Sequence, residues 1–353
     1  MSISQSSGLS RSSSVEGKSA SKPLIGGTIF HFLFLGGAAW FIIGSYLDSW
    51  AHNNVPRLET FFTPWHGVLY SGMLVTAAVL FTTILINHRR GASWQEAIPV
   101  GYEISVFGVI MMFLAGIGDA TWHTLFGIEK DFDGVLSPTH IALMISTGMI
   151  ILGSYRALAS RKGNLSKADQ LILTLTFTLF LALVTNITQM ATVYTRLWPL
   201  TMPASNSDGQ LLSVVSFILQ GLLLAGIVLV VLRRWRLPIG FFTCSLTAIA
   251  IGISFMQSQF VIDIPLGIIS GLLLDISYYF LKPSFKRELQ FRLFCVILCS
   301  VTPAVYLLLV RLIMGPLLWT IHLTIGSVVA CGLFGWLLSY VAYPSVILTE
   351  TQE

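Results

Sequence analysis

Residues 210–236 read QLLSVVSFILQGLLLAGIVLVVLRRWR, an uncharged apolar run that ends in Arg233, Arg234 and Arg236. A helix needs about 20 apolar residues to cross a bilayer core of roughly 30 Å, and this run is long enough. Arginines directly after such a run are typical of the cytoplasmic end of a span, and Trp235 is typical of the membrane–water interface. The stretch therefore predicts a transmembrane helix with a cytoplasmic C-terminal end.

Similar apolar runs recur along the whole chain of 353 residues. Hydrophobic residues make up 54% of the chain and charged residues only 10%, too few to cover the surface of a soluble protein of this length. We therefore predict an all-α, polytopic integral membrane protein, a helical bundle of about ten transmembrane helices. The predicted spans are 24–47, 65–87, 98–121, 138–158, 169–194, 210–232, 239–258, 261–281, 292–313 and 317–340.

Most basic residues lie on one side of the predicted bundle. The connecting segments 88–90, 156–167, 233–236 and 282–292 are basic, and each follows an even-numbered span. The positive-inside rule places them in the cytoplasm together with both termini. We expect a multi-pass protein of the plasma (inner) membrane, in contact with the lipid bilayer. The net charge of +4 is spread over short loops, so we expect no nucleic-acid partner.

A motif of acidic and histidine residues occurs twice among the first four spans. Residues 48–66 read DSWAHNNVPRLETFFTPWH, and residues 119–140 read DATWHTLFGIEKDFDGVLSPTH. Each copy contains Asp-x3-His, then an acid, then a Thr/Ser-Pro-x-His whose His stands seven residues after that acid. Ionisable groups at the ends of apolar segments are costly unless something compensates them, and a metal would do so.

Each copy is expected to aim one Asp and two His at a shared point on the extracytoplasmic side. The Asp and the first His are four residues apart and share one helical face. A hydroxyl residue followed by proline is typical of a helix start, which places the second His in the first turn of the returning helix. The predicted metal ligands are Asp48, His52, His66, Asp119, His123 and His140.

The acids in the two loops, Glu59 and Asp133, have three candidate roles. They are further ligands, hydrogen-bond partners of the ligating histidines, or general bases for a bound water. Imidazole and carboxylate without thiolate suit Cu(II), Zn, Fe or Mn. The spacing leaves open whether the hairpins form two mononuclear sites or one shared dinuclear site.

Two structural interpretations compete with metal binding. In the first, the histidines and acids form hydrogen-bonded pairs that tie the hairpins together at a wet interface. In the second, the repeat is a duplicated folding signal whose Ser/Thr-Pro caps start helices and bind nothing. Four ionisable positions and a cap recur at equivalent places in both hairpins, and this recurrence favours metal binding.

Residues 119–140 resemble the metal motif of the C subunit of the copper membrane monooxygenases, the family of particulate methane and ammonia monooxygenases. That motif is an Asp-x3-His, an acid, and a Thr-Pro-Ser-His on the next helix. The resemblance implies that Asp119, His123 and His140 are copper ligands. Residues 47–60 are similar to a stretch that occurs upstream in the same subunit, so the resemblance covers about residues 45–145. It also implies association with partner membrane subunits, and a homo-oligomer is the alternative.

Composition and motifs divide the chain into four parts. Residues 1–22 form a Ser-rich tail, predicted to be disordered and cytoplasmic, and residues 346–353 form a C-terminal tail. Residues 23–160 hold the two metal-site hairpins, and residues 161–345 form a six-helix membrane region. The four cysteines all fall in apolar segments and suggest no disulfide framework.

These observations favour a membrane metalloprotein with monooxygenase-like oxidation of a small or lipid-soluble substrate, with copper as the favoured cofactor and zinc or iron as alternatives. The alternative function is a transporter or metal-handling permease that captures a cation at the Asp/His cluster. In a transporter, Asp275 would lie on the path of the cation. The alternative for Asp275 is a structural hydrogen bond to a nearby Tyr or to Asn186 and Gln189. Asp263, at the outer end of the same span, is expected at the interface. Axial ligation of a haem by His66 and His140 is a third hypothesis, which the neighbouring acids disfavour.

Overall fold

The computed structural model describes residues 24–55, 63–127, 136–192, 194, 197–203, 205–257 and 260–342. The two predicted tails lie outside the described residues, and so do Glu59 and Asp133. Within the described ranges the chain forms helices and no strand. This confirms the predicted helical class.

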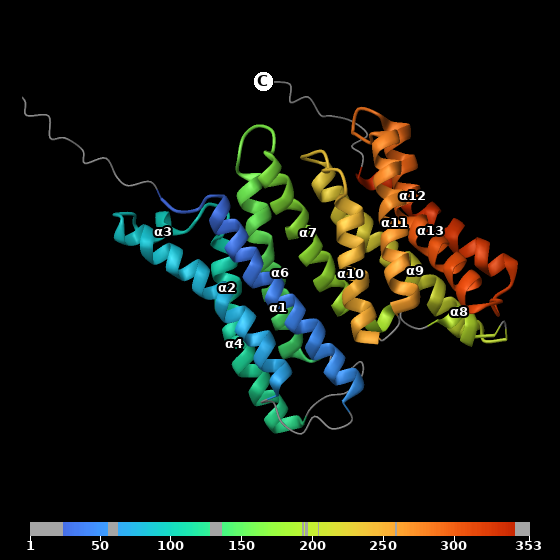
Figure 1. Ribbon diagram of the computed structural model, residues 1–353, viewed down its shortest axis with the longest axis horizontal. Helices are drawn as coiled ribbons and strands as arrows, with labels where there is room; N and C mark the ends of the chain where they lie inside the picture. The colour runs from blue at the N-terminus through green and yellow to red at the C-terminus, as the bar shows by residue number, and fades with distance from the viewer. Residues whose placement is uncertain are drawn as a thin grey trace, which may run out of the picture.

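In the described part of the chain, ten helices of 17 residues or more make up the bundle shown in Figure 1. They are α1 (Thr28–Asn54), α2 (Pro64–Arg89), α4 (Glu103–Phe126), α6 (Pro138–Ala159), α7 (Lys167–Ile187), α9 (Ser207–Leu232), α10 (Phe241–Gln257), α11 (Phe260–Leu281), α12 (Glu288–Leu309) and α13 (Ile321–Ala342). Short segments connect some of them: α3 (Trp94–Ala97), the 3-10 turn η1 (Gln189–Ala191), α8 (Trp198–Thr201) and the π-helical turn η3 (Val310–Met314).

Nine helices within the described residues are long and apolar enough to cross a membrane, so the chain is a multi-pass membrane protein. The tenth, α10, has 17 residues and is about 25 Å long at about 1.5 Å per residue. It is therefore shorter than a typical bilayer core of roughly 30 Å. The count of ten spans and the cytoplasmic location of both termini remain predictions.

Two helix ends differ from the predicted spans in ways that affect the site. The first span was expected to end at residue 47, but α1 continues to Asn54, so that Asp48 and His52 both lie on the helix. The fifth span was expected to reach residue 194, but α7 ends at Ile187 and a 3-10 turn follows. Side-chain hydrogen bonds accompany this turn, because Gln189 donates to Asn186 and accepts from Asn53 of α1.

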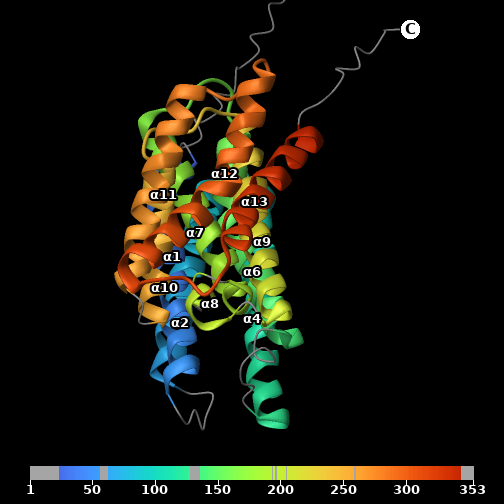
Figure 2. The ribbon, with the colours of Figure 1, turned by 90° about the vertical axis from the view of Figure 1, so that its right-hand side faces the viewer.

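Helices α1, α2, α4 and α6 share one buried apolar core, and a second core runs from α1 and α6 through α7 to α13. Small residues let the paired helices approach closely. A Cβ atom at Gly44 would lie 2.6 Å from the Cα of Leu69, and one at Gly72 would lie 2.5 Å from the amide nitrogen of Phe41. In both views, the C-terminal ends of α1 and α4 and the N-terminal ends of α2 and α6 lie at the lower end of the bundle (Figures 1 and 2).

Large apolar side chains cover much of the outer surface of the helices. A soluble protein rarely exposes apolar surface on this scale, whereas a membrane helix turns such side chains to lipid. The expected contact with the bilayer follows from these residues. Examples with more than half of their surface exposed are Leu33, Phe113, Ile117, Leu211 and Leu333.

A polar network occupies the other end of the first four helices. The Nδ1 atom of His31 lies 2.7 Å from the hydroxyl of Tyr102, and that hydroxyl lies 2.7 Å from the hydroxyl of Ser154. Arg161 donates to Nε2 of His31 at 3.0 Å and pairs with Asp169. The network ties α1, α6 and α7 together and places His31 away from the repeated motif.

Candidate metal centres

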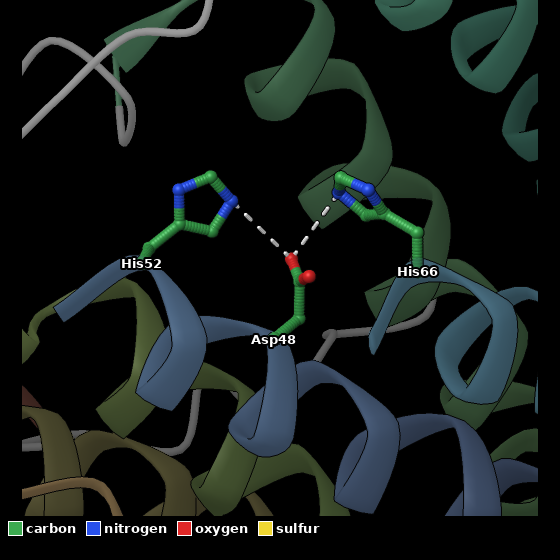
Figure 3. A group of neighbouring side chains, drawn as sticks. All are labelled: Asp48, His52 and His66. Carbon is green, nitrogen blue, oxygen red and sulfur yellow. Dashed lines mark ion pairs between the residues drawn. The ribbon is translucent and has the colours of Figure 1, made fainter. Parts of the chain in front are cut away.

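The first motif brings Asp48, His52 and His66 together, as Figure 3 shows. Asp48 and His52 lie one turn apart near the end of α1, and His66 lies in the first turn of α2. The same carboxylate oxygen, Oδ2 of Asp48, is 3.7 Å from Nε2 of His52 and 3.5 Å from Nε2 of His66. We call these three residues the first cluster.

The second motif repeats the arrangement with Asp119 and His123 of α4 and His140 of α6, which we call the second cluster. Oδ2 of Asp119 is 3.5 Å from Nε2 of His123, and Oδ1 is 3.4 Å from Nε2 of His140. Asp119 therefore offers one oxygen to each histidine, whereas Asp48 offers a single oxygen to both.

The Thr/Ser-Pro element starts the returning helix in both hairpins, which confirms the predicted caps. The hydroxyl of Thr63 accepts the backbone N–H of His66 at 3.2 Å, and the hydroxyl of Ser137 accepts that of His140 at 3.3 Å. The same hydroxyls lie 3.2 Å and 2.8 Å from the Nδ1 atoms of these histidines. Each cap therefore holds Nδ1 and leaves Nε2 turned toward the carboxylate, the arrangement that usually orients a ligating histidine.

The spacing of the carboxylate oxygens and imidazole nitrogens is compatible with a shared metal ion. Within each cluster the candidate ligand atoms all lie within 4.8 Å of one another. The closest N···O distances are 3.4–3.7 Å, longer than the 2.7–3.2 Å of a good N–H···O bond. Two ligands about 2.0–2.2 Å from a tetrahedral metal stand about 3.3–3.6 Å apart. Each cluster could therefore hold a metal ion.

The two clusters differ in what surrounds the carboxylate. The hydroxyl of Thr139 donates a hydrogen bond to Oδ1 of Asp119 at 2.8 Å. The first motif has Trp65 at the equivalent position, and its ring packs edge-on against Trp50 at a centroid distance of 5.5 Å. The Asp119 side chain is 1% exposed and the Asp48 side chain 16%. The second cluster is the more enclosed of the two.

Neighbouring elements hold the helix ends that carry the aspartates. At the end of α4, Nδ1 of His123 lies 3.3 Å from the carbonyl of Gly127, whose φ of +84° suits glycine. At the end of α1, Ser49 donates to Asn186 of α7, and Asn186 donates to Ser45. Asn186 therefore fastens the turn of α1 that bears Asp48.

Tyr70 lies between the two clusters, which the motif analysis did not predict. Its ring is 6.2 Å from the ring of His66, and a Cβ atom at Gly116 of α4 would lie 3.5 Å from its hydroxyl. Tyr70 interacts electrostatically with both Asp48 and Asp119. The sequence signal was its position one turn after His66, but only the tertiary structure, which sets its ring beside Gly116 of α4, brings it near the second cluster.

Two acids of α11 have surroundings that the sequence did not predict. The carboxylate of Asp275 accepts the backbone N–H groups of Phe242 and Thr243 and the hydroxyl of Thr243, at 3.2, 2.9 and 2.6 Å. It therefore caps the first turn of α10, and these three bonds are not the predicted ones to tyrosine, Asn186 or Gln189. Asp263 is 2% exposed and lies among neighbouring helices, and its expected position at the membrane interface remains a prediction. Helix–helix packing gives both acids these surroundings, and the periodicity of the sequence does not determine such packing.

The six predicted ligands are thus gathered into two sets of three, while the roles of Glu59 and Asp133 remain predictions outside the described residues. Neither protein-family models nor curated proteins nor solved structures show a match to this chain. The likeness to the monooxygenase subunit therefore remains a prediction. The identification of the two clusters as candidate metal sites depends on their residue types and on the distances between their ligand atoms.

Proposed function

We propose that this protein is a membrane metalloprotein whose two Asp/His/His clusters bind metal on the extracytoplasmic side, with copper favoured. We further propose that it oxidises a small or lipid-soluble substrate in a monooxygenase-like reaction. The observation that carries the proposal is that two equivalent sets of one carboxylate and two imidazoles converge within 4.8 Å. A structural role would not require this convergence twice.

The donor set supports a metal with open positions. Two imidazole nitrogens and one carboxylate suit Cu(II), Zn and Fe, and three protein ligands leave room for water or another small molecule. The resemblance of residues 119–140 to a copper motif favours copper over the others. A redox-active metal supplies the one-electron and O₂ chemistry that side chains lack.

The chain's own groups would hold and orient the ion. Asp48 and Asp119 supply negative charge, and the caps at Thr63 and Ser137 direct Nε2 of the histidines toward it. The side chains of His52 and His140 are 27% and 23% exposed, which leaves an approach to each cluster.

Apolar side chains next to the second cluster suit a lipid-soluble substrate. Leu125 and Phe126 follow His123 within one turn, and each is 69% exposed. An apolar molecule dissolved in the bilayer would meet these side chains beside the candidate metal. Water-soluble substrates have no comparable reason to gather there.

A cation transporter is the second candidate. Partly exposed acids and histidines at one end of a helical bundle suit the capture of a cation. Asp275, the acid that the sequence suggested for such a path, accepts three hydrogen bonds at the start of α10.

The deciding experiment measures metal content by mass spectrometry on protein purified in mild detergent. We expect stoichiometric copper in the natural protein and its loss from a His52→Ala/His123→Ala variant. His322→Ala is the matched control, because His322 is exposed and belongs to neither cluster. Equal, substoichiometric metal in all three proteins would refute metal binding.

Function is separated from binding by two further measurements on the same proteins. Oxygen consumption that requires metal and an added apolar substrate supports the enzyme. Metal uptake into vesicles without oxygen consumption supports the transporter instead. Full oxygen-dependent activity in the metal-free double variant would contradict the proposed enzyme.

A further inference from the structure

A cavity of about 100 Å³ lies among α7, α9, α10, α11 and α12, in the half of the chain that carries no Asp/His motif. Leucine, isoleucine, valine and alanine make up ten of its twenty lining residues. Three lining residues have polar side-chain atoms without a hydrogen-bond partner among the described residues, namely Asp263, Ser270 and Thr302. Pro265 of α11 lies two residues after Asp263, and Pro303 of α12 directly follows Thr302.

Asp263 is the most unusual group in this wall. It is 2% exposed, and neither of its carboxylate oxygens has a hydrogen-bond partner among the residues that the structure describes. Among the described residues that line the cavity, it is the only charged side chain. The second buried acid of the same helix, Asp275, shows the contrast, because it accepts three hydrogen bonds.

A carboxylate in such a place is stabilised either by a cationic partner or by taking up a proton. Burial without a partner is costly in the membrane interior, where acids generally mark a site for an ion, a proton or a ligand. Asp263 lies in the first turn of α11, and the dipole of that helix favours a negative charge there. The dipole contribution is smaller than the cost of burying an ion, so it does not replace a partner.

We propose that this cavity binds a small organic cation of the primary-ammonium class, whose nitrogen pairs with Asp263 and whose alkyl group lies against the apolar wall. Ser270 and Thr302 add unpartnered hydroxyls to the same wall among the described residues. This site is separate from the two metal clusters and goes beyond the proposed function.

The wall favours an organic cation over an inorganic one. A divalent cation such as Ca²⁺ takes about six to eight oxygen ligands, whereas this wall offers one carboxylate and scattered hydroxyls among apolar side chains. An ammonium ion on a short alkyl chain matches a wall that is mostly apolar with one acidic spot. Ligand pockets in general combine an apolar wall with a few polar groups that fix orientation.

The volume of the cavity determines how large a test ligand it can hold. An engineered apolar cavity of about 150 Å³ binds benzene, which has about six non-hydrogen atoms. A cavity of about 100 Å³ therefore suits about four such atoms. Propylammonium has that size, and 1-propanol is its neutral counterpart.

The experiment measures binding of propylammonium chloride to the full chain in mild detergent by calorimetry, with 1-propanol and sodium chloride as comparison ligands. We expect propylammonium to bind, and the comparison ligands not to bind. Asp263→Asn keeps the shape and removes the charge, and should weaken binding by roughly 30-fold or more. Asp208→Asn removes an exposed carboxylate from α9 and should leave binding unchanged.

A second variant keeps the test decisive if Asp263→Asn does not fold. Ser270→Leu retains Asp263 and fills the cavity, so it should abolish propylammonium binding. No binding to the natural protein, or equal binding to the natural protein and both cavity variants, would overturn the proposal. Binding of sodium in place of propylammonium would overturn the ligand class. Metal content measured in the same samples shows whether a failure concerns this cavity or the metal clusters.

Discussion

The first and second clusters contain the same three residue types at the same spacing, yet their surroundings differ. Asp119 is 1% exposed and accepts a hydrogen bond from Thr139, whereas Asp48 is 16% exposed and has Trp65 at the equivalent position. Groups that hydrogen-bond to a ligand orient it and increase its affinity for metal. The two copies of the motif thus have the same candidate ligands but differ in the side chains around the aspartate.

The difference leads to an expected order of affinity. The second cluster should bind metal more tightly and release it more slowly, because its carboxylate is held by Thr139 and shielded from water. The first cluster is held mainly through its helix, since Asn186 bonds to Ser45 and Ser49 on either side of Asp48. Three changes to the chain test this order.

The largest effect is expected from removing the carboxylates one at a time. Asp119→Asn and Asp48→Asn should each lose about half of the bound metal, since each removes the charged ligand of one cluster. The metal that remains should resist a chelator in Asp48→Asn and leave readily in Asp119→Asn. Metal-to-protein ratios after timed dialysis against a chelator check this. If either variant loses all of its metal, the two clusters form one shared centre, and the expected difference in affinity between them is wrong.

A smaller effect is expected from Thr139→Val, which removes the hydroxyl that bonds to Asp119 and keeps the side-chain shape. The affinity of the second cluster should fall about 10- to 100-fold, while the first cluster is unaffected. Competition with a chromophoric chelator measures both affinities. The matched control is Thr124→Val in α4, the helix that carries Asp119, because the hydroxyl of Thr124 donates to the carbonyl of Ala120 and not to a carboxylate. An equal loss in the control would show that the effect is not specific to Asp119.

The smallest effect is expected from Trp65→Thr, which gives the first cluster the hydroxyl that the second one has. Metal affinity there should rise by up to about tenfold. Stability should fall by about 1 kcal/mol or more, because the edge-on contact with Trp50 is lost.

Trp65→Val separates the two consequences, because it loses the ring contact without gaining a hydroxyl. Its thermal stability should fall as much as that of Trp65→Thr, and its metal affinity should not rise. An equal gain in metal affinity in both variants would mean that the size of the Trp65 ring, and not the lack of a hydroxyl, lowers the affinity of the first cluster.

Local sequence determined the helical architecture and the membership of each cluster. Long apolar runs predict membrane helices, because backbone groups in lipid must bond within one segment. Likewise, residues four apart share a helix face, and a hydroxyl before proline starts a helix. Those short-range rules sufficed to group Asp48 with His52, and Asp119 with His123. With the helix starts they also placed His66 and His140.

Tertiary structure alone decided which of these residues are enclosed and which meet across helices. The ring of Tyr70 on α2 reaches Gly116 of α4 and so lies near both clusters, and Asp263 faces a cavity because five helices surround it. Asp275 caps α10 for the same reason, whereas the sequence left open a cation path or a bond to tyrosine, Asn186 or Gln189. A sequence pattern sets which residues share a face, but the neighbour of that face depends on contacts between distant segments, which have no local signature.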